Sequence, residues 1–365
     1  MFTDIAMSHA DACRFCWMCR HVCPVGLTSG KEGNTPRGKA IVVSMDSRNI
    51  PLGGEAAELM YECCLCEGCS NDCVTGYEPP MFIREARSRL VAEGLLPHHI
   101  QKLVDQALEG KFYDNEPNEE LKKAIAQLPP KADVLFYIGG EGIHYSAQNA
   151  VDFMKVLKAV GIEFTALEQE PYTGTHLGDL IGYTDEVRRE SEACAKQMIN
   201  TGAKTIVVLD PSDARFIKQQ WNEWGIDIEA EVLTATSYAV QLFKEGKLKL
   251  KKLTHEKVTY HDPCRLARAL EETEAARRLI EAMGIHILEM STNKKLTKCC
   301  SGSVFSEVAP KMSKELVNAR WKDAADAGAN KMITSCPACH HILGGSVPDG
   351  YTILDIYSLL AQASA

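Results

Sequence analysis

Two dense cysteine runs near the N-terminus constrain this chain more than any other feature. Both have the spacing C-x2-C-x2-C-x3-C that is typical of bacterial ferredoxins. In this spacing three thiolates on one tight loop bind three corners of a cluster, and the fourth reaches the other cluster. We therefore predict two [4Fe-4S] clusters. The ligands of the first are Cys13, Cys16, Cys19 and Cys73, and those of the second are Cys63, Cys66, Cys69 and Cys23.

Zinc is the alternative metal for these runs. Structural zinc sites bring two separated cysteine pairs into a tetrahedron, and a run of four cysteines this dense matches that pattern poorly. Cys64 falls outside the ferredoxin register and is interpreted as a bystander or buried thiol. The sequence thus favours iron–sulfur clusters over zinc in the first hundred residues.

Composition excludes several other classes of protein. The 365 residues suffice for two or three domains. A net charge of -9 and a pI near 5.7 argue against nucleic acid as a partner. No window approaches the length of a membrane span, and the N-terminal residues show no secretion signal. Fifteen is an odd count of cysteines, which disfavours an extracellular disulfide framework. We expect a cytoplasmic protein, with peripheral attachment to a membrane through a partner as an option.

From Ala132 onward the pattern alternates between short apolar segments and amphipathic ones. The segments that predict strands are ADVLFYIG, KTIVVLD, KVTYHD and KMITSC. The segments that predict helices each end in glycine; they are SAQNAVDFMKVLKAVG, SEACAKQMINTG, EAARRLIEAMG and SKELVNARWKDAADAG. This alternation indicates parallel sheets with crossover helices.

The same part of the chain contains an internal repeat. Three blocks recur in the same order at offsets of 124, 123 and 126 residues, which predicts two homologous lobes. The expected domains are a cysteine-rich domain at 1–100, a helical connector at 101–131, a first α/β lobe at 132–244 and a second at 245–365. The lysine-rich segment at 243–257 is interpreted as a solvated linker, with docking of an acidic partner as the alternative.

The last lobe carries a second group of cysteines. They are Cys264, Cys299, Cys300, Cys336 and Cys339. Each follows a predicted strand or begins a helix, so we expect them to converge at one edge of the sheet. Cys336-Pro337 places a thiol at a helix N-terminus, where the dipole should lower its pKa. A thioredoxin-like dithiol is the alternative for the isolated C-P-A-C motif. His261, His340 and His341 lie nearby and are interpreted as filler or backbone-bonded residues, with proton transfer as the alternative.

Together these motifs resemble a known family. Residues 1–100, with Pro-Arg-Gly-Lys at 36–39, are similar to the α-helical ferredoxin domain in iron–sulfur subunits of glycolate oxidase, anaerobic glycerol-3-phosphate dehydrogenase and heterodisulfide reductase. The five later cysteines resemble the cysteine-rich CCG domain of these families, with Cys-Cys-Ser-Gly in place of Cys-Cys-Gly. Val74 departs from the pattern, which often has proline there. The resemblance implies a third iron–sulfur cluster in the last lobe, of a non-cubane type in some members; others hold a cubane cluster or zinc.

In the first lobe, the positions that match these ligands have no sulfur. Gly140 takes the place of Cys264, and Asp210 and Asp213 stand where Cys336 and Cys339 stand. PYTG at 171–174 replaces the cysteine pair. The aspartates are interpreted as helix caps, with a replacement cation site as the alternative. Cys194 is interpreted as buried packing, and GGEG at 139–142 is too weak a signal for a phosphate loop. The expected fold is an α-helical ferredoxin domain followed by two CCG-type α/β lobes, the first without its cysteines.

These features predict an oxidoreductase subunit that transfers electrons. No dinucleotide fingerprint is present, so we expect a separate flavin-dependent dehydrogenase or electron-transfer flavoprotein as partner, and a quinone, membrane subunit or carrier as acceptor. The alternatives are a thiol/disulfide reductase acting at the last-lobe cluster and a scaffold that holds zinc. The sequence identifies no catalytic residue.

Overall fold

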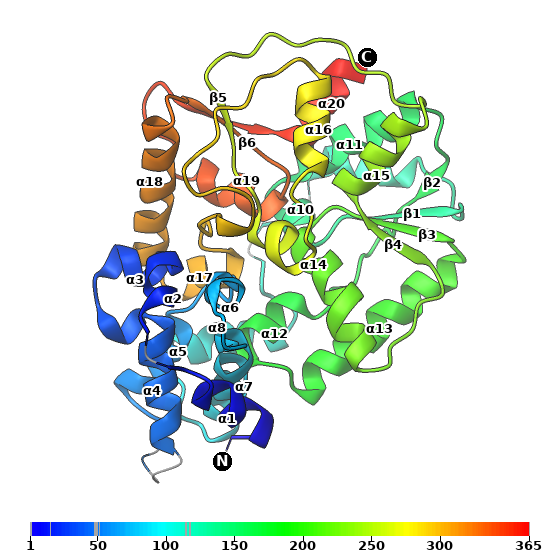
Figure 1. The fold of residues 1–365 in the computed structure, drawn as a ribbon. Coiled ribbons are helices and arrows are strands. Elements are labelled where there is room, and N and C mark those ends of the chain that lie inside the picture. Colours follow the sequence, from blue (N-terminus) through cyan, green and yellow to red (C-terminus); the bar gives the residue numbers. More distant parts are fainter. Residues whose placement is uncertain are drawn as a thin grey trace. The chain divides into compact units, whose positions relative to one another are not determined.

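A computed structural model describes residues 2–14, 16–46, 50, 52–113, 115–116 and 118–364 (Figure 1). The chain forms two compact units, and neither is continuous in sequence. The first unit comprises Met1–Phe112, His176–Val187 and Lys294–Arg320. The second comprises Tyr113–Thr175, Arg188–Asn293 and Trp321–Ala365. Two segments from within the lobe sequences therefore belong to the unit that contains the N-terminal cysteine runs.

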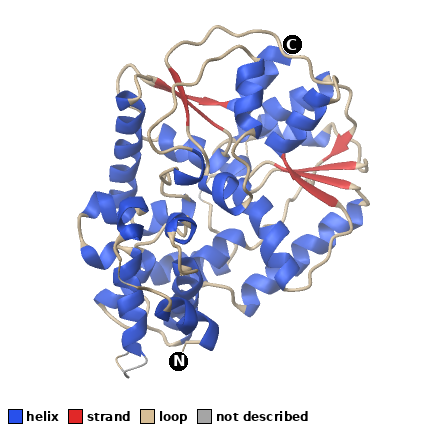
Figure 2. Cartoon of the chain, in the orientation of Figure 1, coloured by secondary structure: helices blue, strands red, loops and turns tan. Residues whose placement is uncertain are grey.

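The described part of the first unit is helical and contains no strand (Figure 2). Its N-terminal helices are α1 (Asp4–Asp11), α2 (Met18–Val22), α3 (Pro24–Ser29), η1 (Glu32–Asn34), α4 (Pro36–Asp46), α5 (Glu55–Tyr61), α6 (Gly68–Asp72), α7 (Pro79–Ala92) and α8 (His98–Leu108). The later segments add α12 (Thr175–Ile181), η4 (Lys294–Leu296), α17 (Ser303–Val308) and most of α18 (Pro310–Asp326). α7 packs against α1, α4, α5 and α6, which makes it the central helix of the unit.

The second unit contains two parallel sheets. In the first sheet, β1 (Val134–Tyr137), β2 (Phe164–Thr165), β3 (Thr205–Val208) and β4 (Glu231–Thr234) have the order β2-β1-β3-β4. In the second, β5 (Val258–Tyr260), β6 (Lys331–Thr334) and β7 (Thr352–Asp355) have the order β5-β6-β7. A parallel bridge from Val258 to Ile287 corresponds to the pairing of Val134 with Phe164. Both sheets thus repeat one topology.

Helices connect the strands of both sheets. Those of the first lobe are α9 (Glu119–Ala126), α10 (Gly140–His144), α11 (Ala147–Ala159), α13 (Asp185–Thr201), α14 (Pro211–Arg215), η2 (Phe216–Trp221) and α15 (Ala235–Lys244). Those of the second are η3 (Arg265–Ala269), α16 (Ala275–Ala282), α19 (Pro337–Gly344) and α20 (Ile356–Ser364). One apolar core runs through both lobes, with Phe153 of α11 against Tyr357 of α20 at 5.2 Å between ring centroids. Burial of this shared core stabilises the lobes as one body.

The structure confirms the predicted α/β architecture with parallel sheets. The four predicted strands correspond to β1, β3, β5 and β6, and the four predicted helices lie within α11, α13, α16 and α18. The glycine after each of α11 and α16 has positive φ, 72° at Gly161 and 76° at Gly284, as a helix C-terminus that ends in glycine requires. Strands β2, β4 and β7 were not predicted. None of the described helices has both the length and the apolar composition to span a bilayer.

Candidate metal centres

The two N-terminal cysteine runs fold in the same way. In each run, the residue after the second cysteine is the N-cap of a short helix and has a left-handed backbone, with φ of 71° at Trp17 before α2 and 63° at Glu67 before α6. A non-glycine residue in this region costs about 1–2 kcal/mol. The reversal turns the chain back on itself, so the first three cysteines of each run face one point.

Two cavities in the first unit are lined by these sulfurs. One is lined by Cys13, Cys16, Cys19 and Cys73. The other is lined by Cys23, Cys63, Cys66 and Cys69. The fourth cysteine of each run lies with the three of the other run. Each cavity therefore offers the four predicted cysteine ligands, which is the donor set of a [4Fe-4S] cluster, and the second cavity is also lined by Cys64.

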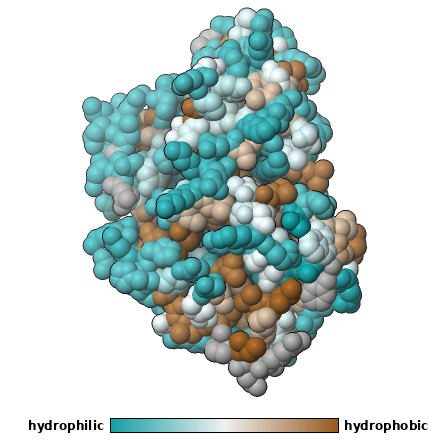
Figure 3. Space-filling view, turned by 90° about the vertical axis from the view of Figure 1, so that its left-hand side faces the viewer, coloured by the Kyte–Doolittle hydropathy of each residue, from teal (hydrophilic) through white to brown (hydrophobic). Residues whose placement is uncertain are grey.

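The first of these cavities opens at the surface. Cys16 is exposed, and the Trp17 side chain beside it is 44% exposed. The guanidinium groups of Arg20 and Arg37 lie 5.0 and 4.6 Å from the centroid of the Trp17 ring. Further exposed apolar residues of the first unit are Ile5, Met18, Leu27, Met45, Ile50, Val74, Met81, Leu95, Leu108 and Leu296. Apolar atoms are visible at the surface in the lower half of Figure 3.

The second cavity is lined by cysteines that are all partly or fully buried, and two buried cations lie near it. The Lys39 side chain is 1% exposed, and its ammonium group donates a hydrogen bond to the Asn34 carbonyl at 2.9 Å. Arg87 of α7 donates to the backbone carbonyls of Met60 and Cys63, at 3.0 and 2.8 Å from Nη2. Arg87 therefore fixes the backbone that leads into the second cysteine run.

Without a bound metal, Cys19, Cys23 and Cys69 hold their protons firmly, because burial raises the pKa of each thiol. Burial raises the pKa of Cys19 to about 11 and that of Cys23 to about 12, although the Lys39 charge partly offsets the rise for Cys23. At Cys73 burial also raises the pKa, but hydrogen bonds from Thr75 and Tyr77 together lower it below the ordinary value. Since metal binds the thiolate form, filling these cavities must release protons.

Cys64 lies between the second cavity and the cysteine pair before α17. Its side chain lines the cavity and packs near Val25 and Phe305. It also shares a side-chain hydrogen bond with Cys299. Burial raises the pKa of Cys64 to about 12, and the bond to Cys299 lowers it in part. Cys64, interpreted from the sequence as a bystander or buried thiol, is partly buried, and its contact with Cys299 was not predicted, because the sequence shows only its position next to Cys63.

The structure divides the five later cysteines between the two units. Cys299 and Cys300 are buried in the segment Lys294–Arg320 of the first unit, and the other three belong to the second. Cys336 is the N-cap of α19, and its sulfur accepts a hydrogen bond from the Cys339 amide at 3.4 Å. Burial nevertheless raises the pKa of Cys336, so the predicted lowering is wrong: desolvation outweighs the helix terminus.

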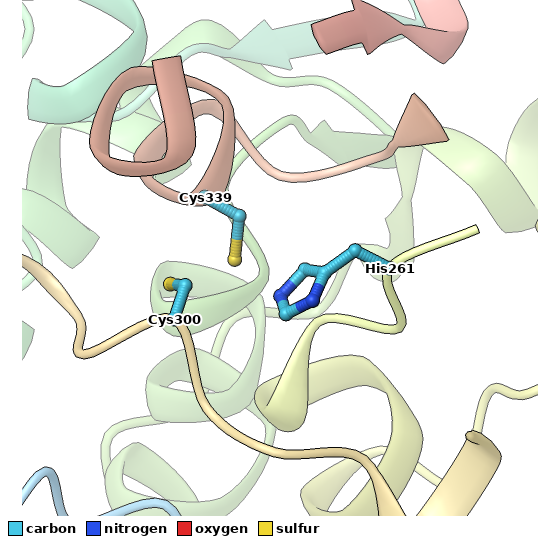
Figure 4. Close-up of side chains that lie close together, drawn as sticks. All are labelled: His261, Cys300 and Cys339. Carbon is cyan, nitrogen blue, oxygen red and sulfur yellow. The ribbon is translucent and has the colours of Figure 1, made fainter. Parts of the chain in front are cut away.

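His261 is a further donor near these cysteines. It follows β5, is fully buried, and brings a ring nitrogen within 4.8 Å of the Cys339 sulfur. Figure 4 shows the two side chains on the loop after β5 and on α19; it also labels Cys300, on the loop that leads into α17. The His261 imidazole and the Cys339 thiol, both in the second unit, are donors of the kind that a soft metal ion or cluster prefers. Burial lowers the pKa of His340 and of His341, so both are neutral near pH 7.

In the first lobe, protein side chains fill the space at the matching positions. The Asp210 carboxylate accepts a hydrogen bond from the Ser212 amide at 2.7 Å, which confirms the predicted helix cap. A Cβ atom on Gly140 would lie 2.3 Å from the Tyr113 ring, so the tyrosine occupies the space of a side chain there. Cys194 is fully buried on α13, as predicted.

The chain is similar to known iron–sulfur oxidoreductase subunits. Residues 258–344 match the family model "Cysteine-rich domain" (CCG). The chain is 27% identical to a subunit of dihydromethanophenazine:CoB–CoM heterodisulfide reductase from Methanosarcina barkeri, over 99% of this chain and 95% of that one. It is 23% identical to EtfAB:quinone oxidoreductase from Syntrophomonas wolfei, over 80% of this chain and 44% of that one.

A solved structure shares the fold. It is titled as a hypothetical protein from Helicobacter pylori, with a TM-score of 0.61 and 12% identity, over 91% of this chain and 68% of that one. Fold, cysteine cavities and relatives together define an iron–sulfur oxidoreductase subunit. More particularly, residues 258–344 match the CCG cysteine-rich domain, and over almost its whole length the chain is similar to the heterodisulfide reductase subunit of Methanosarcina.

Proposed function

We propose that this chain is the electron-transfer subunit of a larger oxidoreductase. In this proposal Cys13, Cys16, Cys19 and Cys73 hold one [4Fe-4S] cluster, and Cys63, Cys66, Cys69 and Cys23 hold a second. A third iron–sulfur cluster is held by Cys264, Cys299, Cys300, Cys336 and Cys339. When bound, these clusters supply one-electron chemistry. Residues 1–100 would form the ferredoxin domain, 101–131 the connector, and 132–244 and 245–365 the lobes without and with metal ligands.

One observation carries the proposal. Within the first unit, Cys64 lines the second cavity and hydrogen-bonds to Cys299, which is a predicted ligand of the third cluster. The first cavity, by contrast, opens to solvent at Cys16. The chain's own residues thus connect a surface-exposed sulfur site through the second cavity to the cysteine pair before α17.

The exposed end of this path suits a redox partner. Trp17 between two guanidinium groups offers an apolar and cationic surface beside the first cavity. We propose that a flavin-dependent dehydrogenase or an electron-transfer flavoprotein exchanges electrons here, as the name of the Syntrophomonas relative suggests. The other end would serve a quinone, a membrane subunit or a soluble carrier.

The alternative function is reduction of a disulfide at the third centre. It is favoured by His261, whose buried ring lies within 4.8 Å of the Cys339 sulfur and could give a proton to a leaving thiolate. The Methanosarcina relative is named as a heterodisulfide reductase subunit. The matching positions of the first lobe contain no cysteine, so symmetric attack by paired clusters is not available to this chain.

Metal analysis and EPR under anaerobic conditions test the proposal. The chain should contain about twelve irons and matching sulfide. An EPR signal of the third centre that is unchanged by thiols or disulfides supports electron transfer, and one that depends on them supports the reductase. About eight irons with zinc would overturn both in favour of a scaffold. Cys339→Ser should remove the third centre alone; loss of all iron would contradict separate sites.

Removal of the Cys64 thiol should slow electron transfer to the third centre. Cys64→Ala deletes the hydrogen bond to Cys299 while leaving every predicted ligand in place. A hydrogen bond to a ligand sulfur stabilises the reduced form, so we expect a more negative potential for the third centre. EPR-monitored redox titration measures that potential, and rapid-freeze kinetics measures the rate. Cys194→Ala, at a buried thiol in the second unit, is the control. Identical titrations in both variants would contradict a role for Cys64.

Loss of the buried ammonium group of Lys39 should lower the potential of the second cluster. Lys39 is among the charges that act on Cys23, and its positive charge favours the more negative, reduced state. At an effective dielectric constant of 20, one nearby charge contributes on the order of 1–3 kcal/mol, or about 40–130 mV for one electron. Lys39→Met is compared with Lys31→Met, an exposed lysine of the same segment. A potential that is equal in the two variants would show that Lys39 does not tune this site.

A further inference from the structure

The first lobe contains a group of buried carboxyl groups that the proposed function does not use. Asp213 is 2% exposed, Glu141 is 1% exposed and Asp210 is fully buried. Asp213 Oδ1 accepts a hydrogen bond from the Thr173 hydroxyl at 2.5 Å. Glu170 lies close by and accepts the amide hydrogens of Ile138 and Gly139 at 2.8 and 2.6 Å. Burial of so many carboxyl groups is costly unless positive charge accompanies them.

The second oxygen of Asp213 is the unusual feature of this group. Asp213 Oδ2 is buried and has no hydrogen-bond partner in the structure. It faces the backbone, since a Cβ atom on Gly139 would lie 2.3 Å from it. A buried carboxylate oxygen without a donor loses hydration and gains nothing in exchange. A hydrogen atom on this carboxyl would remove the charge that makes burial costly.

A proton fits this site better than a metal ion. Among the residues that the structure describes, no three of these carboxyl groups bring oxygens within 4.8 Å of one another, as a shared cation would need. Asp213 faces titratable groups from several elements: Asp210 and Glu141 at the starts of α14 and α10, Glu170 in the loop after β2, Tyr137 of β1, Cys194 of α13 and Tyr113.

These carboxyl groups lie next to the last lobe within the same unit. α14 packs against η3, which begins after Cys264, and Gln219 donates a hydrogen bond to the Ala269 carbonyl at 2.7 Å. Ser146 donates to the Pro337 carbonyl at 2.9 Å, at the first turn of α19. The Asp210 charge acts on the Cys336 thiol. A change of charge at the predicted ligands of the third centre is therefore felt by the buried carboxyl groups.

We propose that Asp213 is the proton-binding group of a site that takes up one proton when the third centre gains one electron. The proposal rests on the proposed function for the electron, which the redox partner supplies; the proton comes from water. The carboxylate then becomes a carboxylic acid, so the charge added to the lobe is balanced. Oxidation reverses both changes. Burial, followed by the charge of Asp210, raises the pKa of Asp213 well above its ordinary value, which agrees with a carboxyl group that binds a proton near neutral pH.

Infrared spectroscopy of the intact, cluster-loaded chain tests the site. In the reduced protein at pH 7 the carbonyl band of a protonated carboxyl group should be present, should shift in heavy water, and should be lost in Asp213→Asn. Asp133→Asn is the control, because this aspartate is exposed and pairs with Lys204 at the surface. If Asp213→Asn does not fold, Thr173→Val should move the band, since it removes the hydrogen bond to Oδ1. A band that is absent from the wild type, or that persists in Asp213→Asn, overturns the proton site.

Coupling to the electron is tested separately. Reduction should strengthen the carboxylic acid band. The potential of the third centre should fall as pH rises, because a lower proton concentration disfavours the reduced state, which binds the proton. In Asp213→Asn the potential should not change with pH. A band that is unaffected by reduction overturns the coupling, and loss of the band on addition of Ca²⁺ or Mn²⁺ alone overturns the proton in favour of a cation. Failure of the proposed function would appear differently, as a third centre that is missing or cannot be reduced.

Discussion

Cys66→Ser should prevent the second cluster from binding and thereby block electron transfer from the first centre to the third. Cys66 lines that cavity with four other cysteines, three of them its predicted co-ligands, and its run turns back at Glu67 immediately after it. Loss of one of four thiolates should remove about four irons per chain. The first and third centres should keep their EPR signals, while reduction from the surface no longer reaches the third. Iron analysis and EPR after reduction by a slow, bulky donor measure these effects.

Cys194→Ser is the matched control for Cys66→Ser. It alters a buried cysteine of α13 that lies outside both cavities of the first unit. Its iron content and rate of electron transfer should equal those of the wild type. Full iron content in Cys66→Ser would show that serine or a neighbouring thiol completes the ligand set, and an unchanged rate would place the electron path elsewhere.

Replacement of Arg87 should destabilise the first unit and release the second cluster before the first. The Arg87 guanidinium is 2% exposed and stacks on Tyr61 at 4.8 Å from the ring centroid. It donates hydrogen bonds to the carbonyls of Met60, Cys63 and Asp179. Arg87→Met leaves these buried carbonyls without their charged donor, which should cost about 3–5 kcal/mol. Urea unfolding without oxygen measures the free energy, and EPR reports which cluster is lost.

Arg89→Met is the control variant, because it removes another arginine of α7 without touching the carbonyls that Arg87 binds. The Arg89 side chain is 16% exposed and pairs with Asp46 and Glu93, whose side chains are 11% and 41% exposed. Loss of these pairs should lower the free energy of unfolding, but both clusters should stay bound, because Arg89 pairs with side chains and not with the carbonyls that lead into the second cysteine run. Loss of the second cluster from both variants would contradict an anchoring role for Arg87.

Local spacing made much of the architecture predictable. Cysteines two residues apart must share a loop, so the grouping of the first three in each run follows from covalent geometry, and the exchange of Cys23 and Cys73 follows from the ferredoxin pattern. That these groups bind iron in the stated numbers stays a prediction. The four central strands were visible as runs of β-branched and aromatic residues. Strands β4 and β7 were not, because EVLT and TILD each lead directly into an apolar helix and give no separate signal.

Long-range contacts were not predictable from one sequence. Periodicity says which face of a helix is buried and nothing about its distant partner, so the contact of Cys64 with Cys299 had no signal. The same holds for His176–Val187 and Lys294–Arg320, which look like lobe sequence and yet belong to the first unit. For Cys336, the sequence predicted the local structure and not the direction of the pKa shift. The helix N-terminus was predicted correctly, but the pKa direction depended on burial, which the motif does not show.

Tyr113 has a consequence for the history of the first lobe. Its ring stands where a Cβ atom on Gly140 would have to go, so a cysteine restored there would collide with it. Overpacking of this kind is destabilising, and a lone sulfur without partners brings no compensating metal. No single substitution therefore leads back to a metal-binding lobe. A return to metal binding in the first lobe would require Tyr113 to be replaced before a cysteine could be accommodated at position 140.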